Sequence, residues 1–335
     1  MAEVTPALGL TATEVGRALR LASLAPSVHN SQPWRFSLQR DRIELHADER
    51  RRLAATDPEE RELRISCGAA LFNLRLSLED SGIRPLTTLV PNGRSSTPLA
   101  VVRYGGRTRP SHERTRLLQA VYTRRTNRRP FVDAAVPSAQ RAQLIRAVEA
   151  ERGWLYVLAD RKERATLRKL ITRAHHKQMA DPRFRTELAE WTGHDSDRAD
   201  GVPISAGGLR PEPQDEWVLR DFSSGKGVER TPGKDFEAEP LLVVLCSFHE
   251  GARAELQAGQ ALQRLLLTAT TLGLAVSFLS QPIEVPEVRG ELRHALGTTL
   301  APQAVLRIGF GSPVPATPRR AVSELLLPQP QPTAT

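Results

Sequence analysis

An internal repeat is the feature that most restricts how this chain of 335 residues can fold. Residues 68–82 resemble residues 259–273, because both have apolar residues at helical spacing and the same distance between two glycines. Each is followed by a short apolar run that ends at a glycine, residues 99–105 in the first case and residues 303–309 in the second. Each pair reads as a buried helix with a glycine C-cap that precedes a strand. The sequence therefore predicts two similar halves in one chain.

The two predicted halves differ in length. We place the first at residues 1–109 and the second at residues 110–327, and we expect residues 328–335 to form a flexible tail. The excess of the second half lies in residues 191–240, where Gly, Pro, Asp and Ser dominate and neither period 2 nor period 3.6 persists. A loop of that size in a compact domain is usually functional or disordered.

Aromatic residues in this excess segment can act as apolar anchors that pack it against the rest of the protein. We expect residues 191–240 to be a lid insertion, with Trp217 and Phe222 as the lid candidates that could cover a bound molecule. The alternative is a solvated insertion with no role.

Composition indicates an ordinary folded protein. Hydrophobic residues make up 40% of the chain and charged residues 25%. The longest apolar runs are too short to span a bilayer, and no secretory signal is visible at the N-terminus, so we expect a cytoplasmic protein without membrane contact. Only Cys67 and Cys246 are present, each inside an apolar segment, which favours reduced thiols that serve as small hydrophobic groups.

Several classes of site find no support in the sequence. No GxSxG elbow or P-loop lysine motif occurs, and the eight histidines form no HExxH or Cys/His ligand set, so we expect no metal. The net charge of +9 keeps a nucleic-acid-binding protein as a weaker alternative, because arginine-dense surfaces bind nucleic-acid backbones. The chain lacks the aromatic interleaving of a single-strand binder, which makes nucleic acid an unlikely partner.

Residues 25–36, which read Ala-Pro-Ser-Val-His-Asn-Ser-Gln-Pro-Trp-Arg-Phe, form the first segment with recognisable chemistry. A Pro-Ser turn that leaves a helix exposes backbone N–H groups, and Asn30 and Gln32 add carboxamides that both donate and accept. A flavin ring edge needs this mixed chemistry. The alternative is a helix-ending loop whose polar side chains satisfy their own backbone. His29 could tune a bound flavin, or it could be bonded to the backbone.

Two arginine-rich segments point to an anion. Residues 124–131 hold four arginines in six positions, and guanidinium groups beside Thr and Asn can cover the oxygens of a phosphate monoester. A solvated basic helix end is the alternative. Residues 307–320 run from a strand into a proline-spaced arm that ends in two arginines, and prolines would make this arm semi-rigid.

These three segments together resemble the nitroreductase superfamily, and in particular its Acg-like branch. The resemblance spans nearly the whole chain and implies an α+β, nitroreductase-like FMN-binding fold with two fused halves, a pseudo-dimer that arose by gene duplication. Ordinary members are homodimers with FMN at the subunit interface. Here the ring-binding turn occurs only in the first half and the arginine-rich segments only in the second, which implies one complete FMN site per chain.

The resemblance also assigns residues. Which of Arg124, Arg125 and Arg128 contact the phosphate is left open. Contacts to the flavin ring or ribityl chain fall on Ser27, Asn30, Gln32, Pro33, Trp34 and Arg35, and contacts to the phosphate on Arg124, Arg125, Asn127, Arg128, Thr317, Arg319 and Arg320.

The implied activity is that of an NAD(P)H-dependent flavoprotein oxidoreductase that reduces nitroaromatic, quinone or related small-molecule acceptors. The flavin carries the chemistry, so no side chain is predicted to be catalytic. The alternative from another class is a catalytically silent protein that sequesters or senses FMN, with the lid closed over the flavin. The fused halves are compatible with a monomer as well as a homodimer.

Overall fold

The computed structural model describes residues 3–91, 98–194, 197–212, 214–227 and 240–328. The predicted tail therefore lies, apart from its first residue, outside the described residues. The helices are α1 (Ala12–Ser23), α2 (Arg61–Asp80), α3 (His112–Thr123), α4 (Ser138–Glu149), α5 (Arg161–Ala180), α6 (Pro182–Trp191), α7 (Ala252–Thr271), α8 (Gln281–Glu284) and α9 (Pro286–Ala295).

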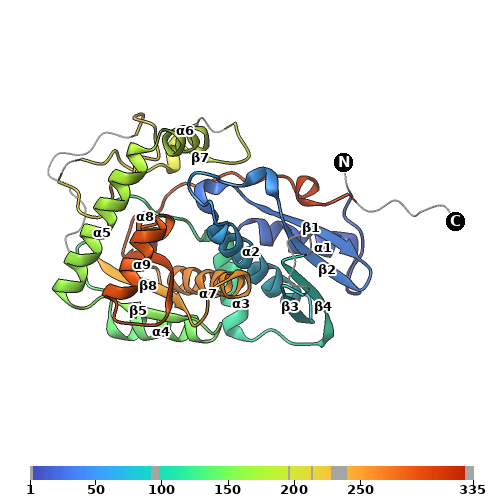
Figure 1. The fold of residues 1–335 in the computed structure, drawn as a ribbon. Helices are drawn as coiled ribbons and strands as arrows, with labels where there is room; N and C mark the ends of the chain where they lie inside the picture. The colour runs from blue at the N-terminus through green and yellow to red at the C-terminus, as the bar shows by residue number, and fades with distance from the viewer. Residues whose placement is uncertain (1–2, 92–97, 195–196, 213, 228–239, 329–335) are drawn as a thin grey trace.

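Two four-stranded antiparallel sheets organise the molecule (Figure 1). The first has the order β1-β2-β4-β3 and the second the order β5-β8-β10-β9. Each sheet therefore repeats the same path, in which the first two strands pair, a long helix follows, and the last two strands pair. The strands are β1 (Trp34–Gln39), β2 (Arg42–Ala47), β3 (Ile83–Leu89), β4 (Ala100–Arg107), β5 (Trp154–Val157), β8 (Leu241–Ser247), β9 (Ala275–Phe278) and β10 (Ala301–Gly309).

The long helices that follow the second strand of each sheet are α2 and α7, and they contain the repeat seen in the sequence. The glycines after their C-termini, Gly82 and Gly273, have φ of +79° and +73°, so the predicted left-handed caps are confirmed. Both helices begin seven residues earlier than the repeat, because the matched glycines lie inside them.

α2 and α7 pack against each other at the centre of the molecule (Figure 1). A Cβ built on Gly68 would stand 3.0 Å from the Cα of Gly259, and one built on Gly259 would stand 2.9 Å from the Cα of Gly68. Ile65 of α2 is buried in the second core and Leu256 of α7 in the first. Both pairs are separated by 191 residues in sequence, as expected where equivalent residues meet across an internal two-fold relation.

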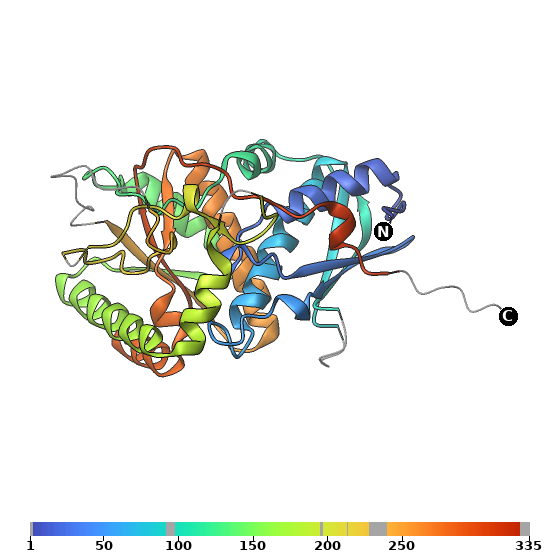
Figure 2. The ribbon, with the colours of Figure 1, turned by 90° about the horizontal axis from the view of Figure 1, so that it is seen from above.

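The chain end crosses from the second sheet to the first (Figure 2). Leu325 and Leu326 are buried in the first core, and the N–H of Leu327 donates to the carbonyl of Phe36 at 2.8 Å. The last described segment thus belongs to the second half by sequence and packs on the first half.

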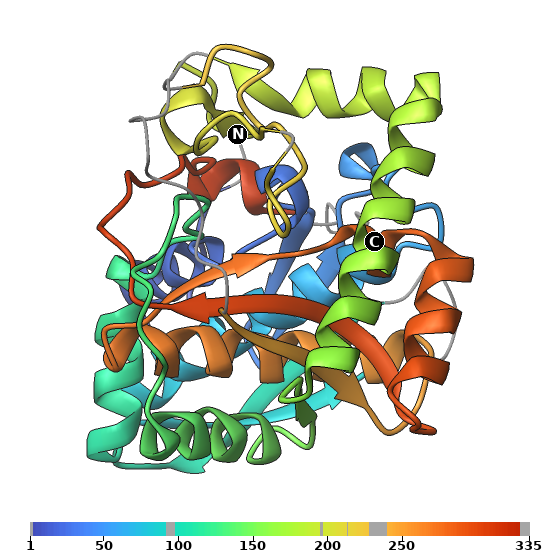
Figure 3. The ribbon, with the colours of Figure 1, turned by 90° about the vertical axis from the view of Figure 1, so that its left-hand side faces the viewer.

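The insertion is longer than expected. β1 and β2 are joined by two residues, whereas residues 158–240 separate β5 from β8 and include α5, α6 and the short parallel pair β6 (Thr192–His194) and β7 (Val202–Pro203). α5 and α6 have ordinary helical patterns, so nothing in the sequence marked them as part of the insertion. Figure 3 shows them beside and above the second sheet. In the described ranges no helix is long and apolar enough to cross a membrane.

Candidate functional site

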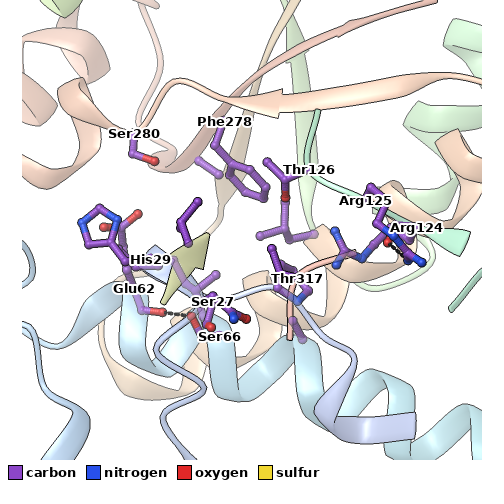
Figure 4. Close-up of a pocket in the computed structure, with 18 of the residues that line it drawn as sticks. Ser27, His29, Glu62, Ser66, Arg124, Arg125, Thr126, Phe278, Ser280 and Thr317 are labelled. Carbon is purple, nitrogen blue, oxygen red and sulfur yellow. Dashed lines mark hydrogen bonds between the residues drawn. The ribbon is translucent and has the colours of Figure 1, made fainter. Parts of the chain in front are cut away.

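A cavity of about 290 Å³ opens between the two halves. Its walls come from the turn after α1, the first three turns of α2, the segment after α3, α7, the end of β9, the middle of β10, α8, the C-terminal arm and the insertion (Figure 4). Small-molecule sites in proteins begin at about this size and usually combine an apolar wall with a few polar groups.

Arg124, Arg125 and Arg319 line one end of the cavity. Arg124 follows the last residue of α3 and is only 5% exposed. Its Nη2 donates to the carbonyl of Leu24 at 3.5 Å, while its Nε and Nη1 have no partner in the described chain. Burial lowers the pKa of Arg124 to about 9, and the nearby charge of Arg319 acts in the same direction.

Arg319 is delivered to this end by the C-terminal arm. Its guanidinium donates to Oδ1 of Asn30 at 2.9 Å, to Oγ1 of Thr317 at 2.6 Å and to the carbonyl of Ser23 at 2.7 Å. Burial lowers the pKa of Arg319 to about 10, with a further contribution from Arg125. The arm and the turn after α1 are thus fixed to each other around one cation.

Within the part of the chain that the structure describes, these cations have no acidic partners. Among the described residues, no carboxylate lies within ion-pair distance of Arg124, Arg125, Arg128 or Arg319, whereas the adjacent Arg320 pairs with Asp48 at 3.2 Å. A buried charge without a counter-charge is costly. A bound phosphate would supply that counter-charge and would accept from the unpartnered donors of Arg124, so the residues present fit an anionic group at this end.

The turn after α1 has a strained backbone. His29, Asn30 and Gln32 all have positive φ, between 49° and 55°, and such conformations of non-glycine residues concentrate at functional sites. Oγ of Ser27 accepts from the backbone N–H of Gln32 at 2.9 Å, which closes the turn. The insertion on one side and the C-terminal arm on the other hold this turn in place.

The carboxamides of the turn make many of these holding contacts. Nδ2 of Asn30 donates to the carbonyls of Gly201 at 3.0 Å and Pro318 at 3.1 Å. Nε2 of Gln32 donates to the carbonyl of Ala199 at 2.8 Å, and Oε1 accepts from the N–H of Arg320 at 2.9 Å. Gln32 is fully buried and does not line the cavity.

The structure divides the predicted site residues into two groups. Trp34 is fully buried in the first core, and Trp217 is buried among residues of α5 and α9. Nδ2 of Asn127 donates to the carbonyl of Ser312 at 2.9 Å. The residues that line the cavity are Ser27, Asn30, Arg124, Arg125, Arg128, Thr317, Arg319 and Phe222, and those that do not are Gln32, Pro33, Trp34, Arg35, Asn127, Arg320 and Trp217.

Phe222 brings the insertion to the cavity. Its ring centroid lies 6.0 Å from that of His29, and the guanidinium carbon of Arg128 lies 4.4 Å from the same centroid. Nη1 of Arg128 also donates to the carbonyl of Ala206 at 3.0 Å. Burial lowers the pKa of Arg128 to about 10, with a further contribution from Arg220. The insertion therefore reaches the cavity wall through the ring of Phe222, which lies against Arg128 of the segment after α3.

The opposite end of the cavity contains groups that the sequence analysis did not single out. Arg220 and Glu284 form a buried ion pair, and Gln178 bridges them, accepting from Arg220 at 2.7 Å and donating to Glu284 at 2.6 Å. Arg220 lowers the pKa of Glu284 against the effect of burial. Glu62 and Ser66 reach the cavity from α2, on the helix face that also carries Ile65 and Ala69. Their helical spacing on the repeated helix was a signal that could have found them.

A second hollow, of about 900 Å³, lies at the position related to the cavity by the internal repeat. Adding 191 to Glu62, Ser66 and Ala69 of the cavity gives Arg253, Gln257 and Gln260, which line the second hollow. There the turn after α4 places the buried Glu151 in ion pairs with Arg75 at 2.8 Å and Arg264 at 3.3 Å. Arg75, which lines this hollow together with Glu151, is thus already paired with a buried carboxylate, whereas Arg152 and Arg253 on its wall are exposed.

Comparison with known proteins identifies relatives along nearly the whole chain. A protein of Mycobacterium tuberculosis (strain H37Rv), provisionally named NAD(P)H nitroreductase Acg, is 31% identical over 323 residues, which cover 94% of this chain and 96% of the relative. A second protein of that strain with a provisional NAD(P)H nitroreductase name is 30% identical over 324 residues and is covered to 91%. No protein-family model matches.

Solved structures add weaker likenesses. A nitroreductase from Desulfovibrio desulfuricans, crystallised with FMN, is 18% identical with a TM-score of 0.37, over 64% of this chain and 98% of that one. A nitroreductase with bound FMN from Bacteroides fragilis is 16% identical with a TM-score of 0.36, over 58% of this chain and 88% of that one.

Proposed function

The chain belongs to the nitroreductase superfamily, in its Acg-like branch, and from that membership we propose that it is an FMN-dependent NAD(P)H oxidoreductase with one flavin site per chain. The site is the cavity between the two halves, which we place at residues 1–109 and 110–327 with a lid inserted in the second. The observation that carries the proposal is the buried cationic end of this cavity, whose arginines have no acidic partner in the described chain.

The residues of the cavity would share the work of binding. Arg124, Arg125 and Arg319, with the hydroxyl of Thr317, would hold the phosphate, because they are the donors that converge on the cationic end. Ser27 and the backbone of the turn after α1 would lie along the ring. FMN, when bound, supplies the capacity to accept a hydride from NAD(P)H and to pass electrons on. The protein's part is to position the ring and to restrict water.

Nitroaromatic compounds, quinones and related small molecules are the proposed acceptors. The names of the relatives support nitro compounds among these acceptors. The remaining wall of the cavity is largely apolar and includes Ile65, Leu262, Phe278 and Ile283, which suits an aromatic molecule of modest size.

The test is anaerobic mixing of the purified, FMN-loaded protein with excess NADPH or NADH, while the absorbance of the oxidised flavin is followed. We expect the flavin to bleach and to be reoxidised by an added nitroaromatic compound or quinone. We also expect the double variant Arg124→Ala with Arg128→Ala to purify without flavin. The exposed Arg116→Ala on α3 serves as the matched control and should retain it. Full flavin occupancy in the double variant would refute the assignment of the phosphate to Arg124.

A second candidate function is supported by Phe222, which covers part of the cavity together with Arg128. If the insertion stays closed, the protein would store or sense FMN instead of turning over. The same mixing experiment separates the two, because a silent protein keeps its oxidised flavin in the presence of NADPH. Bleaching that appears only in Phe222→Ala would favour the silent function, and equal bleaching in both proteins would favour the enzyme.

A further inference from the structure

The end of the cavity opposite the arginines carries two titratable side chains to which the proposed function gives no role. Figure 4 shows His29 and Glu62 there, with Ser27 and Thr317 between them and Arg124. His29 belongs to the strained turn after α1, and Glu62 lies in the first turn of α2. Two separate elements of the first half thus direct polar groups to the same end of the cavity.

Both side chains have a buried atom without a hydrogen-bond partner. His29 is only 4% exposed, and within the described part of the chain neither its Nε2 nor Oε2 of Glu62 is bonded. Most buried polar atoms in proteins are satisfied, and leaving one unsatisfied costs free energy. Two such atoms on the wall of one cavity indicate that a bound molecule completes their hydrogen bonding.

Charges from three directions face Glu62. Burial raises its pKa well above the ordinary value, and the carboxylates of Glu284 on α8 and Asp57 before α2 raise it further. Arg61 on its own helix and Arg220 of the insertion act in the opposite direction without reversing the shift. The raised pKa favours the protonated carboxyl group, which can donate a hydrogen bond as well as accept one.

His29 shares part of this environment. Burial lowers its pKa to about 3; the cations Arg220 and Arg128 act in the same direction, and Glu284 opposes them. The imidazole is neutral at pH 7 and has one donor and one acceptor nitrogen. The imidazole of His29 and the protonated carboxyl group of Glu62 are therefore uncharged hydrogen-bonding groups beside the ion pair between Arg220 and Glu284, whereas the arginines at the other end carry charges without a carboxylate partner in the described chain.

The repeat provides a comparison for Glu62. The residue 191 positions later, at the equivalent place on α7, is Arg253, which is exposed at the rim of the second hollow. The packing of α2 against α7 thus does not require an acidic residue here. The carboxyl group is a property of this cavity alone.

We propose that the Glu62 carboxyl group contacts the molecule bound in the cavity and donates a hydrogen bond to a neutral, carbonyl-like acceptor oxygen, with the His29 imidazole as the second polar contact. This inference rests on the proposed function and assigns a specificity-determining group to the same site. The acceptor oxygen has two sources, a carbonyl of the flavin ring or an oxygen of the second substrate. The experiment below separates them.

The variants are Glu62→Leu, which removes the donor, and Glu62→Gln, which keeps an N–H donor. Glu59→Gln is the matched control, because this carboxylate lies three residues away, is exposed and does not line the cavity. FMN is titrated onto ligand-free protein by quenching of its fluorescence. Menadione, a neutral quinone, is titrated onto FMN-loaded protein by the change in flavin absorbance. The titration in which Glu62→Leu weakens binding identifies the source of the oxygen: the flavin if FMN binding is weakened, and the second substrate if menadione binding is weakened.

We expect Glu62→Leu to weaken FMN or menadione binding by about tenfold or more, Glu62→Gln by less than about threefold, and Glu59→Gln not at all. Unchanged binding of both probes to Glu62→Leu would overturn the proposal. Equal losses in Glu62→Leu and Glu62→Gln would also overturn it, because shape and not the donor would then be the cause.

Two measurements on ligand-free protein keep the inference separate from the proposed function. The infrared difference spectrum between the wild type and Glu62→Gln at pH 7 should contain the C=O band of a protonated carboxyl group. A spectrum without this band would overturn the inference. Glu62→Leu should melt at or above the wild-type temperature, since it removes an unsatisfied polar group. Wild-type protein that binds no FMN would refute the proposed function, while the infrared band still decides the state of Glu62.

Discussion

Arg124 shows how the cationic end of the cavity is built at the scale of one residue. Its side chain is buried, its charged neighbours are other arginines, and two of its three nitrogens have no partner in the described chain. Such a group opposes folding of the ligand-free protein, because desolvation of the charge is not compensated. A buried, unpaired guanidinium at this position is explained if a ligand supplies the missing negative charge.

This argument predicts opposite effects of one substitution. Arg124→Met keeps much of the side-chain volume and removes the charge. We expect the ligand-free variant to melt a few degrees above the wild type, about 1 to 3 kcal/mol more stable, and to bind FMN at least about tenfold more weakly. Thermal unfolding with and without FMN measures both. A variant that is less stable and binds FMN normally would show that Arg124 is structural.

His29 gives a prediction for the dependence of stability on pH. Its folded pKa of about 3 is lower than its ordinary value, so the unfolded chain binds more protons between about pH 3 and pH 6.5. The stability linked to the neutral imidazole is present above about pH 6.5 and is lost as the pH falls through this window. We expect His29→Asn, which tolerates the positive φ, to show a smaller loss between pH 7 and pH 4 in urea unfolding. The prediction would be contradicted if the free energy of unfolding fell equally between pH 7 and pH 4 in the wild type and in His29→Asn.

At the scale of elements, the contact between α2 and α7 leaves no room for a side chain at its centre. A Cβ on Gly68 would collide with the backbone carbonyl of Leu256, and one on Gly259 with that of Ile65. Backbone atoms in the middle of two packed helices cannot move away as a flexible side chain can. The two glycines are therefore required by packing.

We expect Gly68→Ala to destabilise the protein by about 3 kcal/mol or more. Gly290→Ala is the matched control, because Gly290 lies inside α9 with nothing within 4 Å of its Cβ position, and there alanine should stabilise by about 0.5 to 1 kcal/mol. Chemical denaturation of both variants makes the comparison. Similar changes in the free energy of unfolding for Gly68→Ala and Gly290→Ala would mean that α2 and α7 can move apart without loss of stability.

The sequence predicted regular elements better than it predicted the use of polar side chains. Periodicity and glycine caps located both repeated helices and the strands β4 and β10, because burial of one face imposes those patterns, whereas β3 and β9, which come directly after the helices, were not predicted. The cationic end was also visible in the sequence, as arginines at 124, 125 and 319. The carboxamide of Gln32, in contrast, bonds to Ala199 and Arg320. Residue type shows only that an amide can donate and accept, and contacts across 167 or more residues decide to what.

At the scale of the whole molecule, the two halves depend on each other. Leu256 of α7 completes the first core, Ile65 of α2 completes the second, and the C-terminal arm packs Leu325 and Leu326 on the first half while it brings Arg319 to the cavity. Two subunits of a dimer exchange segments in a similar way. A fused chain is free to change the two related sites independently: in this one Glu151 pairs with Arg75 at the second hollow, whereas among the described residues the arginines at the cationic end of the cavity have no carboxylate partner.

This asymmetry predicts the stoichiometry of flavin binding. At the second hollow, Arg75 is already paired with Glu151, which lines the same hollow, so a phosphate bound to Arg75 would have to displace a buried carboxylate. In the cavity, the arginines of the cationic end have no carboxylate partner among the described residues, so a phosphate can pair with them without displacing one. We therefore expect one FMN per chain, measured by calorimetric titration together with the mass of the complex in solution by light scattering. Binding of two FMN per chain would contradict the prediction, and Glu151→Ala is the variant in which a second, weaker flavin should be sought. If Glu151→Ala still binds only one FMN, the shape of the second hollow as well as its charge excludes the flavin.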